Sequence, residues 1–337
     1  MQPFGHVAVL GGGAWGTALA VHLTSRSNVR PRVTLYVRSA SKARDILATR
    51  ENGRYLPRIE LPAELTITSQ IADVASADVL FLATPVAELT DVVDRLIEAQ
   101  IAAPLVSLAK GFIETPNGSI PWSLPHQVLR EQWRHGVATA TGPTFAVEVA
   151  QALPTALVVA GTDRGLSEQV AALLRSDALR AYPSDDQVGI EVGGAVKNVF
   201  AIAAGASDGL AFGDNARAAL VTRGLAESVR LSAALGGKRE TLMGLAGLGD
   251  LVLTCTGNLS RNRRVGLALS QGQPLAAIMS ELGHVAEGVQ ATRAVRDLAR
   301  HFGIDMPIVD AVFRVLYENV APRDAVLALL AREPRAE

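Results

Sequence analysis

Short apolar runs recur along the first half of the chain, and segments with helical spacing follow several of them. The run VLFLA at 79–83 has no polar interruption, which is typical of a strand buried on both faces of a parallel sheet. Similar runs predict strands at 7–10, 33–37, 105–108, 137–140, 155–160 and 179–182, with a short edge segment at 65–68. Helical patterns occupy 17–26, 88–98 and 166–175. Strands that alternate with helices predict a doubly wound, Rossmann-type α/β domain at the N-terminus.

The pattern changes after residue 186, because no convincing strand follows it. Apolar residues on every face predict a mostly buried helix at 190–210. Further helices are predicted at 214–235, with Asp214 as its N-cap, and at 261–270, 289–302, 308–319 and 323–330. The glycine-rich stretch 245–250 and its continuation to 260 predict a loop. We therefore predict a dinucleotide-binding domain at 1–188 and an all-α domain for substrate binding and catalysis at 189–337.

Composition narrows the classes of function. The chain of 337 residues is 49% hydrophobic with a formal net charge of -1, so no field of one sign attracts nucleic acid or an anionic membrane. No apolar run approaches the ~18 residues of a membrane span, and the first residues do not resemble a signal peptide. The single cysteine, Cys255, excludes an internal disulfide and a cysteine-rich zinc site. We expect a cytoplasmic protein with a small-molecule substrate, without a metal, nucleic-acid partner or membrane span.

A glycine fingerprint lies between the first strand and the first helix. In a dinucleotide-binding fold, Gly11 makes the tight turn, Gly13 lets the backbone approach the pyrophosphate, and Gly16 lets the helix pack against the strand. The phosphates would bind at the helix N-terminus, where free amides and the helix dipole favour an anion. The alternative is a glycine-rich turn without a ligand.

Arg38 follows the second predicted strand, where this fold usually places a carboxylate that binds the adenosine ribose. An arginine at this position suits a 2′-phosphate, and Lys42 and Arg44 follow closely. The sequence therefore predicts that NADP(H) is used as well as NAD(H). The alternative is an ordinary solvated cation at the end of a strand.

Lys197 lies in the middle of the buried helix at 190–210. Helical side chains lean toward the N-terminus, so its ammonium would lie over Gly193 and Gly194. Two glycines inside a helix cost roughly 1 kcal/mol each relative to alanine, so the sequence predicts an open notch beside a cation. The alternative is a lysine that extends to solvent from a half-exposed helix, with glycines that serve helix packing.

Three further segments carry candidate chemistry. Lys110 and the turn with Gly142 and Thr144 follow predicted strands at the carboxyl edge of the sheet, where such sheets bind ligands, although Lys110 is equally compatible with an ordinary surface lysine. The stretch 245–250 offers one carboxylate, Asp250. Ser260 can cap a helix whose first turn holds Arg261, Asn262, Arg263 and Arg264. Cations oppose the dipole there, so either a phosphate binds or the arginines are simply solvated.

Seven stretches together resemble the bacterial NAD(P)-dependent sn-glycerol-3-phosphate dehydrogenases. They are GGGAWGTAL, SLAKGF, GPTFAVEVA, GGAVKNVFAIAAG, GDNARAALVTRGLAE, LAGLGDLVLTCTGNLSRNRRVG and HVAEGV, and their order spans nearly the whole chain. The resemblance implies reduction of dihydroxyacetone phosphate to sn-glycerol 3-phosphate for phospholipid synthesis, by a cytoplasmic enzyme that is often a homodimer. Thr144 and Ala14 stand where the family commonly has serine, and both changes leave the backbone chemistry intact.

The resemblance also implies the site residues. The cofactor site would contain Trp15, Arg38, Tyr55, Lys110, Ala146, Arg261, Val285 and Glu287. The substrate site would contain Lys110, Gly142, Thr144, Lys197, Asp250, Ser260, Arg261 and Asn262. Lys197 would be the proton donor or acceptor, Asp250 would hold it, and the helix start at Ser260 would bind the phosphate.

Two other classes compete with this interpretation. A two-domain dehydrogenase acting on a β-hydroxy acid would share the Lys-Asn pair on its helix but would need a clamp for a carboxylate instead of the SRNRR segment. A nucleotide-sensing protein would bind the cofactor without turnover. A reduced-nicotinamide absorbance assay with dihydroxyacetone phosphate separates the three.

Overall fold

The computed structural model describes residues 4–25, 31–116, 118–282 and 286–331. The chain divides into two compact units, of which unit 1 comprises Met1–Lys110 and Leu124–Gln187, and unit 2 comprises Gly111–Ser123 and Val188–Glu337. The sequence placed Gly111–Ser123 in the first domain, whereas its contacts assign it to unit 2. One such contact is the hydrogen bond of 3.0 Å that the Trp122 indole donates to Asp297.

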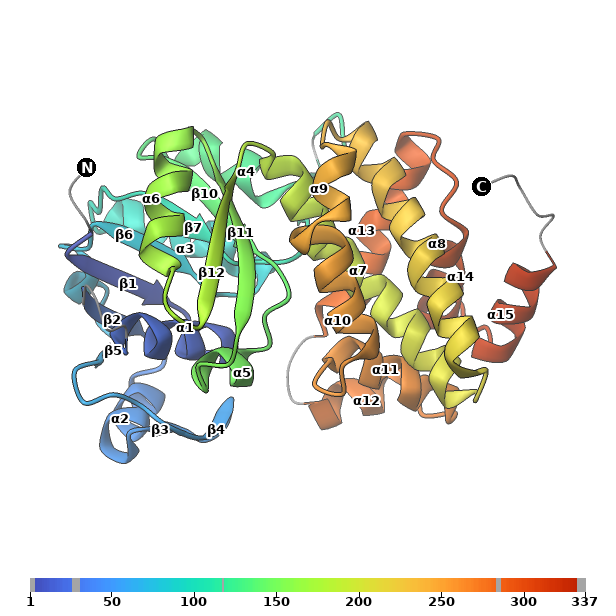
Figure 1. Ribbon diagram of the computed structural model, residues 1–337, viewed down its shortest axis with the longest axis horizontal. Helices are drawn as coiled ribbons and strands as arrows, with labels where there is room; N and C mark the ends of the chain where they lie inside the picture. Colours follow the sequence, from blue (N-terminus) through green and yellow to red (C-terminus); the bar gives the residue numbers. More distant parts are fainter. Residues whose placement is uncertain (1–3, 26–30, 117, 283–285, 332–337) are drawn as a thin grey trace. The chain divides into compact units, whose positions relative to one another are not determined.

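Unit 1 is built on a sheet that has eight strands in the described part of the chain, in the order β12-β11-β10-β7-β6-β1-β2-β5 (Figure 1). The strands are β1 (His6–Leu10), β2 (Arg32–Tyr36), β5 (Thr66–Thr68), β6 (Val79–Leu82), β7 (Leu105–Ser107), β10 (Val137–Thr141), β11 (Thr155–Gly161) and β12 (Leu179–Ser184). All neighbours are parallel except β10 and β11. The predicted doubly wound fold is confirmed, and the antiparallel pairing is an addition that the hydrophobic pattern did not indicate.

Helices cover both faces of the sheet (Figure 1). They are α1 (Ala14–Thr24), α2 (Ala40–Thr49), α3 (Leu89–Glu98), α4 (Pro125–Gln132), α5 (Ala146–Ala150) and α6 (Arg164–Leu174), with 3₁₀ turns η1 (Ile71–Val74) and η2 (Val86–Glu88). Because side chains of a strand alternate between faces, Val79 and Phe81 join one apolar cluster, while Leu80 and Leu82 are buried on the other side. This double burial explains why the VLFLA run shows no polar alternation.

Two small hairpins complete the strands. β3 (Glu51–Asn52) pairs with β4 (Leu56–Glu60), and β8 (Ile113–Glu114) pairs with β9 (Trp122–Ser123). The hydrophobic pattern did not indicate β4, which contains Pro57. Proline is tolerated there because the hairpin has only two strands, so an edge is available for a residue without an N–H.

Unit 2 is helical apart from the β8–β9 hairpin, so far as its residues are described (Figure 1). Its helices are α7 (Gln187–Gly209), α8 (Gly213–Ala234), α9 (Arg239–Met243), α10 (Asp250–Thr256), α11 (Arg261–Ser270), α12 (Leu275–Leu282), α13 (Glu287–His301), α14 (Pro307–Tyr317) and α15 (Pro322–Leu330), with a π-helical turn η3 (Leu245–Gly249). The predicted all-α C-terminal domain is confirmed. Asp214 is not the N-cap of α8, because Phe212 occupies that position and Asp214 pairs with Arg217 in the first turn.

Helix α7 is buried on all sides, as predicted, with residues such as Val196 and Phe200 fully enclosed. Its 23 residues include an 18-residue window of mean hydropathy 1.3, which is long and apolar enough to cross a membrane, but 89% of that window is buried within the protein. Core helices of globular proteins satisfy the same criterion. The helix also carries Lys197 and Asn198, which bind partners inside unit 2.

The predicted loop at 245–260 is mostly helical, because it contains η3 and α10. Packing against α7 explains the difference. A Cβ atom added to Gly193 of α7 would lie 2.4 Å from the Ala246 carbonyl oxygen, so only glycine lets the two backbones approach this closely. The predicted open notch beside Lys197 is therefore occupied by residues 246 and 247 where it borders Gly193. Tertiary contact outweighs the low helix propensity of glycine here.

The Glu227 side chain joins two helices of unit 2. It lies on α8, is 2% exposed, and accepts hydrogen bonds from the backbone N–H groups of Ile308 (2.9 Å) and Val309 (3.4 Å) in the first turn of α14. Burial raises the pKa of Glu227 from 4.5 to about 7, although the two N–H groups oppose this shift. The folded protein therefore retains a proton between these pH values that the unfolded chain releases.

This proton predicts a pH-dependent stability. Binding of this proton to Glu227 stabilises the folded state. The stabilisation is fully present below pH 4.5 and is lost as the pH rises through about 7. A pKa shift of this size corresponds to roughly 3 kcal/mol in the free energy of unfolding. Glu227→Gln keeps the acceptor oxygen but cannot ionise, so its free energy of unfolding should fall less between about pH 5 and about pH 8. Urea titrations measure this, with the exposed Glu98→Gln as control. If the free energy of unfolding fell equally with pH in Glu227→Gln and in wild type, Glu227 would not be the group that carries this proton.

Candidate functional site

The glycine turn of unit 1 has the geometry that a phosphate site needs. Gly11 has a φ of 127°, and a Cβ atom on it would lie 2.5 Å from the Ala83 carbonyl oxygen. A Cβ atom on Gly16 would lie 2.1 Å from the Gly11 carbonyl oxygen. A Cβ atom on Gly13, in contrast, would meet no described atom within 4 Å. Two glycines therefore allow close packing, while the third leaves space beside the N-terminus of α1.

The N-terminus of α1 is suited to an anion. Gly13 is its N-cap, no side chain caps it, and no acidic residue lies in its first turn. Free N–H groups and the helix dipole therefore remain available for a phosphate. Asn52 stabilises the turn, because its amide donates to the Gly12 carbonyl oxygen (3.0 Å) and to Thr17 Oγ1 (2.8 Å). Nothing in the spacing of the sequence indicated this role for Asn52.

Arg38 lies after β2, as predicted, and its guanidinium forms an ion pair of 3.1 Å with Glu88. Its side chain is 62% exposed, so it can still reach a ligand, although a phosphate would compete with Glu88. Farther along the chain, Lys42 and Arg54 lie over the Tyr55 ring, at 5.6 Å and 5.3 Å from its centroid. These two cations and the ring make Tyr55 a stacking surface with positive charge around it.

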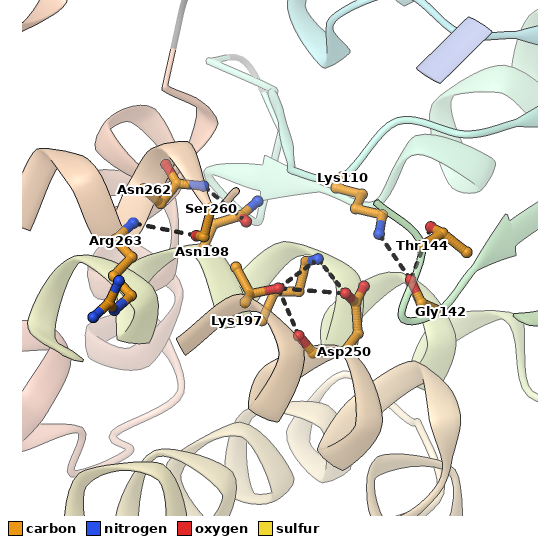
Figure 2. A network of polar contacts seen from close by, with 10 residues as sticks. Lys110, Gly142, Thr144, Lys197, Asn198, Asp250, Ser260, Asn262 and Arg263 are labelled. Carbon is orange, nitrogen blue, oxygen red and sulfur yellow. Dashed lines mark hydrogen bonds and ion pairs between the residues drawn. The ribbon is translucent and has the colours of Figure 1, made fainter. Parts of the chain in front are cut away.

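The carboxyl edge of the sheet brings together three predicted residues. Lys110 follows β7, and its Nζ donates a hydrogen bond of 3.3 Å to the Gly142 carbonyl oxygen (Figure 2). Thr144 Oγ1 donates to the same oxygen at 3.1 Å. Ala146 begins α5 directly after this turn and packs partly against the apolar core. The geometry holds the ammonium of Lys110 beside the backbone turn at 142–144.

Lys197 forms the centre of a buried polar cluster in unit 2. It is 7% exposed, its Nζ forms an ion pair with Asp250 Oδ1, and it donates a hydrogen bond of 2.9 Å to Thr254 Oγ1 (Figure 2). Thr254 in turn donates to the Asp250 backbone carbonyl oxygen at 2.6 Å. Asp250 is 1% exposed and is the first residue of α10, where the helix dipole favours a carboxylate. The interpretation of Lys197 as a solvent-exposed lysine is thus wrong.

Cys255 lies next to this cluster but does not share its chemistry. Burial raises the pKa of its thiol to about 12, and the positive charge of Lys197 offsets only part of that effect. The thiol therefore stays protonated at neutral pH and behaves as a small apolar residue.

Two asparagines form an amide chain beside Lys197. The backbone N–H of Gly288 donates to Asn262 Oδ1 at 3.0 Å. Asn262 Nδ2 donates to Asn198 Oδ1 at 2.9 Å (Figure 2). A backbone N–H can only donate, so it fixes the orientation of the Asn262 amide, which then fixes that of Asn198. The NH₂ group of Asn198 is the donor at the end of this chain.

The start of α11 separates its arginines into two kinds. Ser260 caps the helix, as predicted, by accepting from the Arg263 N–H at 3.2 Å. The Arg263 guanidinium binds Asp208, with Nη2 2.7 Å from Oδ2, so a carboxylate and not a ligand neutralises it. Arg261 is exposed, and within the described ranges it has no acidic partner. Of this pair, Arg261 is the arginine available to a phosphate.

For some of the predicted cofactor residues the structure gives a position but no contact that indicates a role. Trp15 is half-buried and packs against the core of unit 1, and Glu287 is the first residue of α13. Val285 lies outside the described residues.

Sequence reasoning missed Thr254, Asp208 and the role of Asn198. Only the position of Asn198 next to Lys197 in the sequence could have indicated a role for it. Thr254 is one turn after Asp250, which would have placed both on one face had α10 been predicted as a helix. Asp208 carried no signal, because its partner Arg263 is 55 residues away.

Comparisons with known proteins identify the family of the chain. Residues 6–167 match the family described as NAD-dependent glycerol-3-phosphate dehydrogenase N-terminus, and residues 186–327 match the corresponding C-terminus. Glycerol-3-phosphate dehydrogenase [NAD(P)+] from Aromatoleum aromaticum is 50% identical, covering 98% of this chain and 99% of the relative. The enzyme of the same name from Nitrosomonas europaea is 48% identical, with the same coverage.

A solved structure is similar over the same length. The crystal structure of glycerol-3-phosphate dehydrogenase from Coxiella burnetii has a TM-score of 0.90 and 38% identity, covering 97% of this chain and 99% of that chain. The family match spans both units, and the relatives exceed 30% identity over nearly their full lengths. The chain therefore belongs to the NAD-dependent glycerol-3-phosphate dehydrogenase family.

Proposed function

We propose that the chain reversibly reduces dihydroxyacetone phosphate to sn-glycerol 3-phosphate with NADPH or NADH. One observation carries the proposal: unit 2 holds a buried ammonium, Lys197, fixed by Asp250 and Thr254. It also holds Arg261, a cation at a helix N-terminus that has no acidic partner among the described residues. The ammonium can donate a proton to the oxygen of a ketone, and the guanidinium can bind a phosphate. The named activity of the relatives supports this pairing.

The residues of unit 1 fit a dinucleotide. The space beside Gly13 and the uncapped start of α1 suit the pyrophosphate. We assign cofactor binding to Gly11, Gly13, Trp15, Gly16, Arg38, Tyr55, Lys110, Ala146, Arg261, Val285 and Glu287. When bound, the reduced nicotinamide supplies a hydride to the carbonyl carbon.

Lys197 supplies the proton for the same carbonyl group. As negative charge develops on the ketone oxygen, the ammonium stabilises it and then transfers a proton. Asp250 and Thr254 restrict the Nζ position, so little reorganisation is required at that step. We assign the NH₂ group of Asn198 as a second donor for a substrate oxygen. In the reverse direction Lys197, once neutral, accepts the hydroxyl proton.

The start of α11 binds the phosphate of the substrate. The backbone N–H groups of the first turn, the helix dipole and the Arg261 guanidinium all favour a dianion. Asn262 contributes from the same turn, although its side chain already binds Asn198 and Gly288. We assign Gly142, Thr144 and Lys110 to the substrate site as well, because they form one hydrogen-bonded turn at the sheet edge.

The setting of the enzyme is part of the proposal. We infer a cytoplasmic homodimer that supplies glycerol phosphate for phospholipid synthesis. The single buried cysteine agrees with a reducing compartment, and the resemblance implies the dimer.

The decisive experiment measures the loss of reduced-nicotinamide absorbance after dihydroxyacetone phosphate is added to the purified protein and NADPH. Turnover with this substrate and not with a β-keto acid supports the proposal. Binding of NADPH without turnover would instead identify a nucleotide-sensing protein.

Lys197→Met should lower kcat by ~10² to 10⁴-fold, because it keeps most of the stem but removes the transferable proton. NADPH binding by fluorescence should stay nearly unchanged. Removing one partner of a buried ion pair leaves Asp250 uncompensated, so stability should also fall. The double variant Lys197→Met with Asp250→Asn removes that charge and provides a folded protein for the assay.

Lys110→Met is the comparison for this measurement, since Lys110 is the other candidate proton donor. A folded Lys197 variant with kcat within roughly tenfold of wild type would exclude general acid catalysis by Lys197.

Arg261→Ala should lower kcat/KM for dihydroxyacetone phosphate about tenfold to a hundredfold or more, since a charge-assisted bond to a dianion is lost. Unphosphorylated dihydroxyacetone should be affected far less. Arg264→Ala removes the same charge from the same turn and is the matched control. Equal losses for both substrates would show that Arg261 does not bind the phosphate.

Arg38→Glu should raise KM for NADPH more than KM for NADH, because a carboxylate repels a 2′-phosphate and accepts hydrogen bonds from ribose hydroxyls. Arg180→Glu makes the same charge change on β12, at the opposite edge of the sheet. Arg180→Glu is therefore the control. Steady-state kinetics with both cofactors measure the ratio of KM for NADPH to KM for NADH. A ratio unchanged from wild type would mean that Arg38 does not contact the phosphate.

A further inference from the structure

The hydroxyl group of Thr141 is buried at the end of β10 and is not used by the protein. The residue is 4% exposed, and among the described residues its Oγ1 has no hydrogen-bond partner. A buried hydroxyl without a partner loses its hydrogen bonds to water and gains none in return. A valine would fill nearly the same volume without this cost. A partner for this hydroxyl must therefore come from outside the described residues, as an ordered water or a bound molecule.

Thr139 provides the comparison within the same strand. It lies two residues earlier, so its side chain emerges on the same face of the sheet. Its Oγ1 accepts a hydrogen bond of 3.1 Å from Gln187 Nε2, and it is therefore satisfied inside unit 1. The two threonines differ in position along the strand, because Thr141 is the last residue of β10 and lies at the carboxyl edge.

A second hydroxyl shares this condition. Thr84 Oγ1 is also buried without a partner in the described part of the chain. The parallel register aligns Thr139 with Ser107, and Ser107 with Leu82. Thr84 follows Leu82 by two residues, and Thr141 follows Thr139 by two residues. The two hydroxyls therefore lie at the same level of the sheet, one on each side of β7. Of the four buried side-chain atoms without a partner among the described residues, these two hydroxyls lie at the carboxyl edge of the sheet, where such folds bind ligands, whereas Arg50 Nε and Ser232 Oγ lie elsewhere.

The sheet order indicates which part of a ligand reaches this edge. The pyrophosphate would bind at α1, after β1, and Arg38 follows β2, which places the adenosine half on the β2 side. The strands on the other side of β1 are β6, β7 and β10, in that order. The second half of a dinucleotide, the nicotinamide nucleoside, extends over these strands. Its carboxamide has a carbonyl acceptor and an NH₂ donor, and a threonine hydroxyl can pair with either.

We propose that Thr141 Oγ1 hydrogen-bonds the carboxamide of the nicotinamide ring and so fixes the orientation of the ring. This inference rests on the proposed function, because it requires a nicotinamide cofactor. It makes Thr141 a cofactor-binding residue in addition to the glycine turn and Arg38. The hydroxyl is unfavourable in the free protein and becomes paired when the cofactor binds.

The test is Thr141→Val, examined by thermal unfolding and by calorimetric titration with NADPH. The melting temperature without cofactor should rise, because an unpaired buried hydroxyl is removed. The Kd for NADPH should increase about tenfold, as expected when a neutral group loses its partner in a buried site. The Kd for 2′-phospho-ADP-ribose, which lacks the nicotinamide, should not change. Thr141→Ser retains the hydroxyl and should bind NADPH like wild type.

Thr139→Val is the matched control on the same strand and face. It should lower the melting temperature, since Gln187 loses an acceptor, and leave the Kd for NADPH unchanged. An unchanged Kd for NADPH in Thr141→Val would overturn the inference, and so would an equal loss of affinity for 2′-phospho-ADP-ribose. A Thr141→Val protein that is less stable or does not fold would also overturn it, because the hydroxyl would then have a structural partner. Failure of wild type to bind NADPH would instead refute the proposed function.

Discussion

The buried charge of Lys197 constrains much of unit 2. A lysine that is only 7% exposed is tolerated in its charged form only with a counter-charge and further hydrogen bonds, which Asp250 and Thr254 provide. These partners can reach Lys197 only if η3 and α10 pack directly on α7. Gly193 allows that approach, because a Cβ atom there would lie 2.4 Å from a carbonyl oxygen of η3. The glycines of this helix pair are thus a consequence of the ion pair and its burial.

At the start of α11 as well, buried or half-buried polar side chains are paired within the protein. Arg263 is neutralised by Asp208, which also binds Arg217 at 2.8 Å, so this carboxylate ties α7, α8 and α11 together. The Asn262 amide is held between Gly288 and Asn198. With these side chains committed, the first turn of α11 is held in place before any ligand binds. If the phosphate binds there, as proposed, this turn requires little rearrangement, and that lowers the cost of binding.

The hydrophobic pattern predicted the strands of the sheet and the buried helix at 190–210 because both depend on local periodicity. It failed where tertiary packing decides the local structure, as in η3, whose glycines indicated a loop, and in α10, which follows it directly. The candidate site divides in the same way. Lys197 was noticed through the glycines beside it, whereas the pairing of Asn198 with Asn262 joins residues 64 positions apart. Such pairs are set by the fold, so one sequence without its structure does not reveal them.

Unpaired polar groups in this protein differ in how much they say about a ligand. Arg261 is exposed, so water can solvate its guanidinium, and its lack of an acidic partner among the described residues has little energetic weight alone. Its assignment needs the helix N-terminus and the contrast with Arg263. Thr141 is 4% exposed, so water cannot replace the missing partner at the same low cost. Burial gives a missing partner energetic weight, and for Thr141 the position at the carboxyl edge of the sheet, where such folds bind ligands, is what connects that weight to a bound molecule.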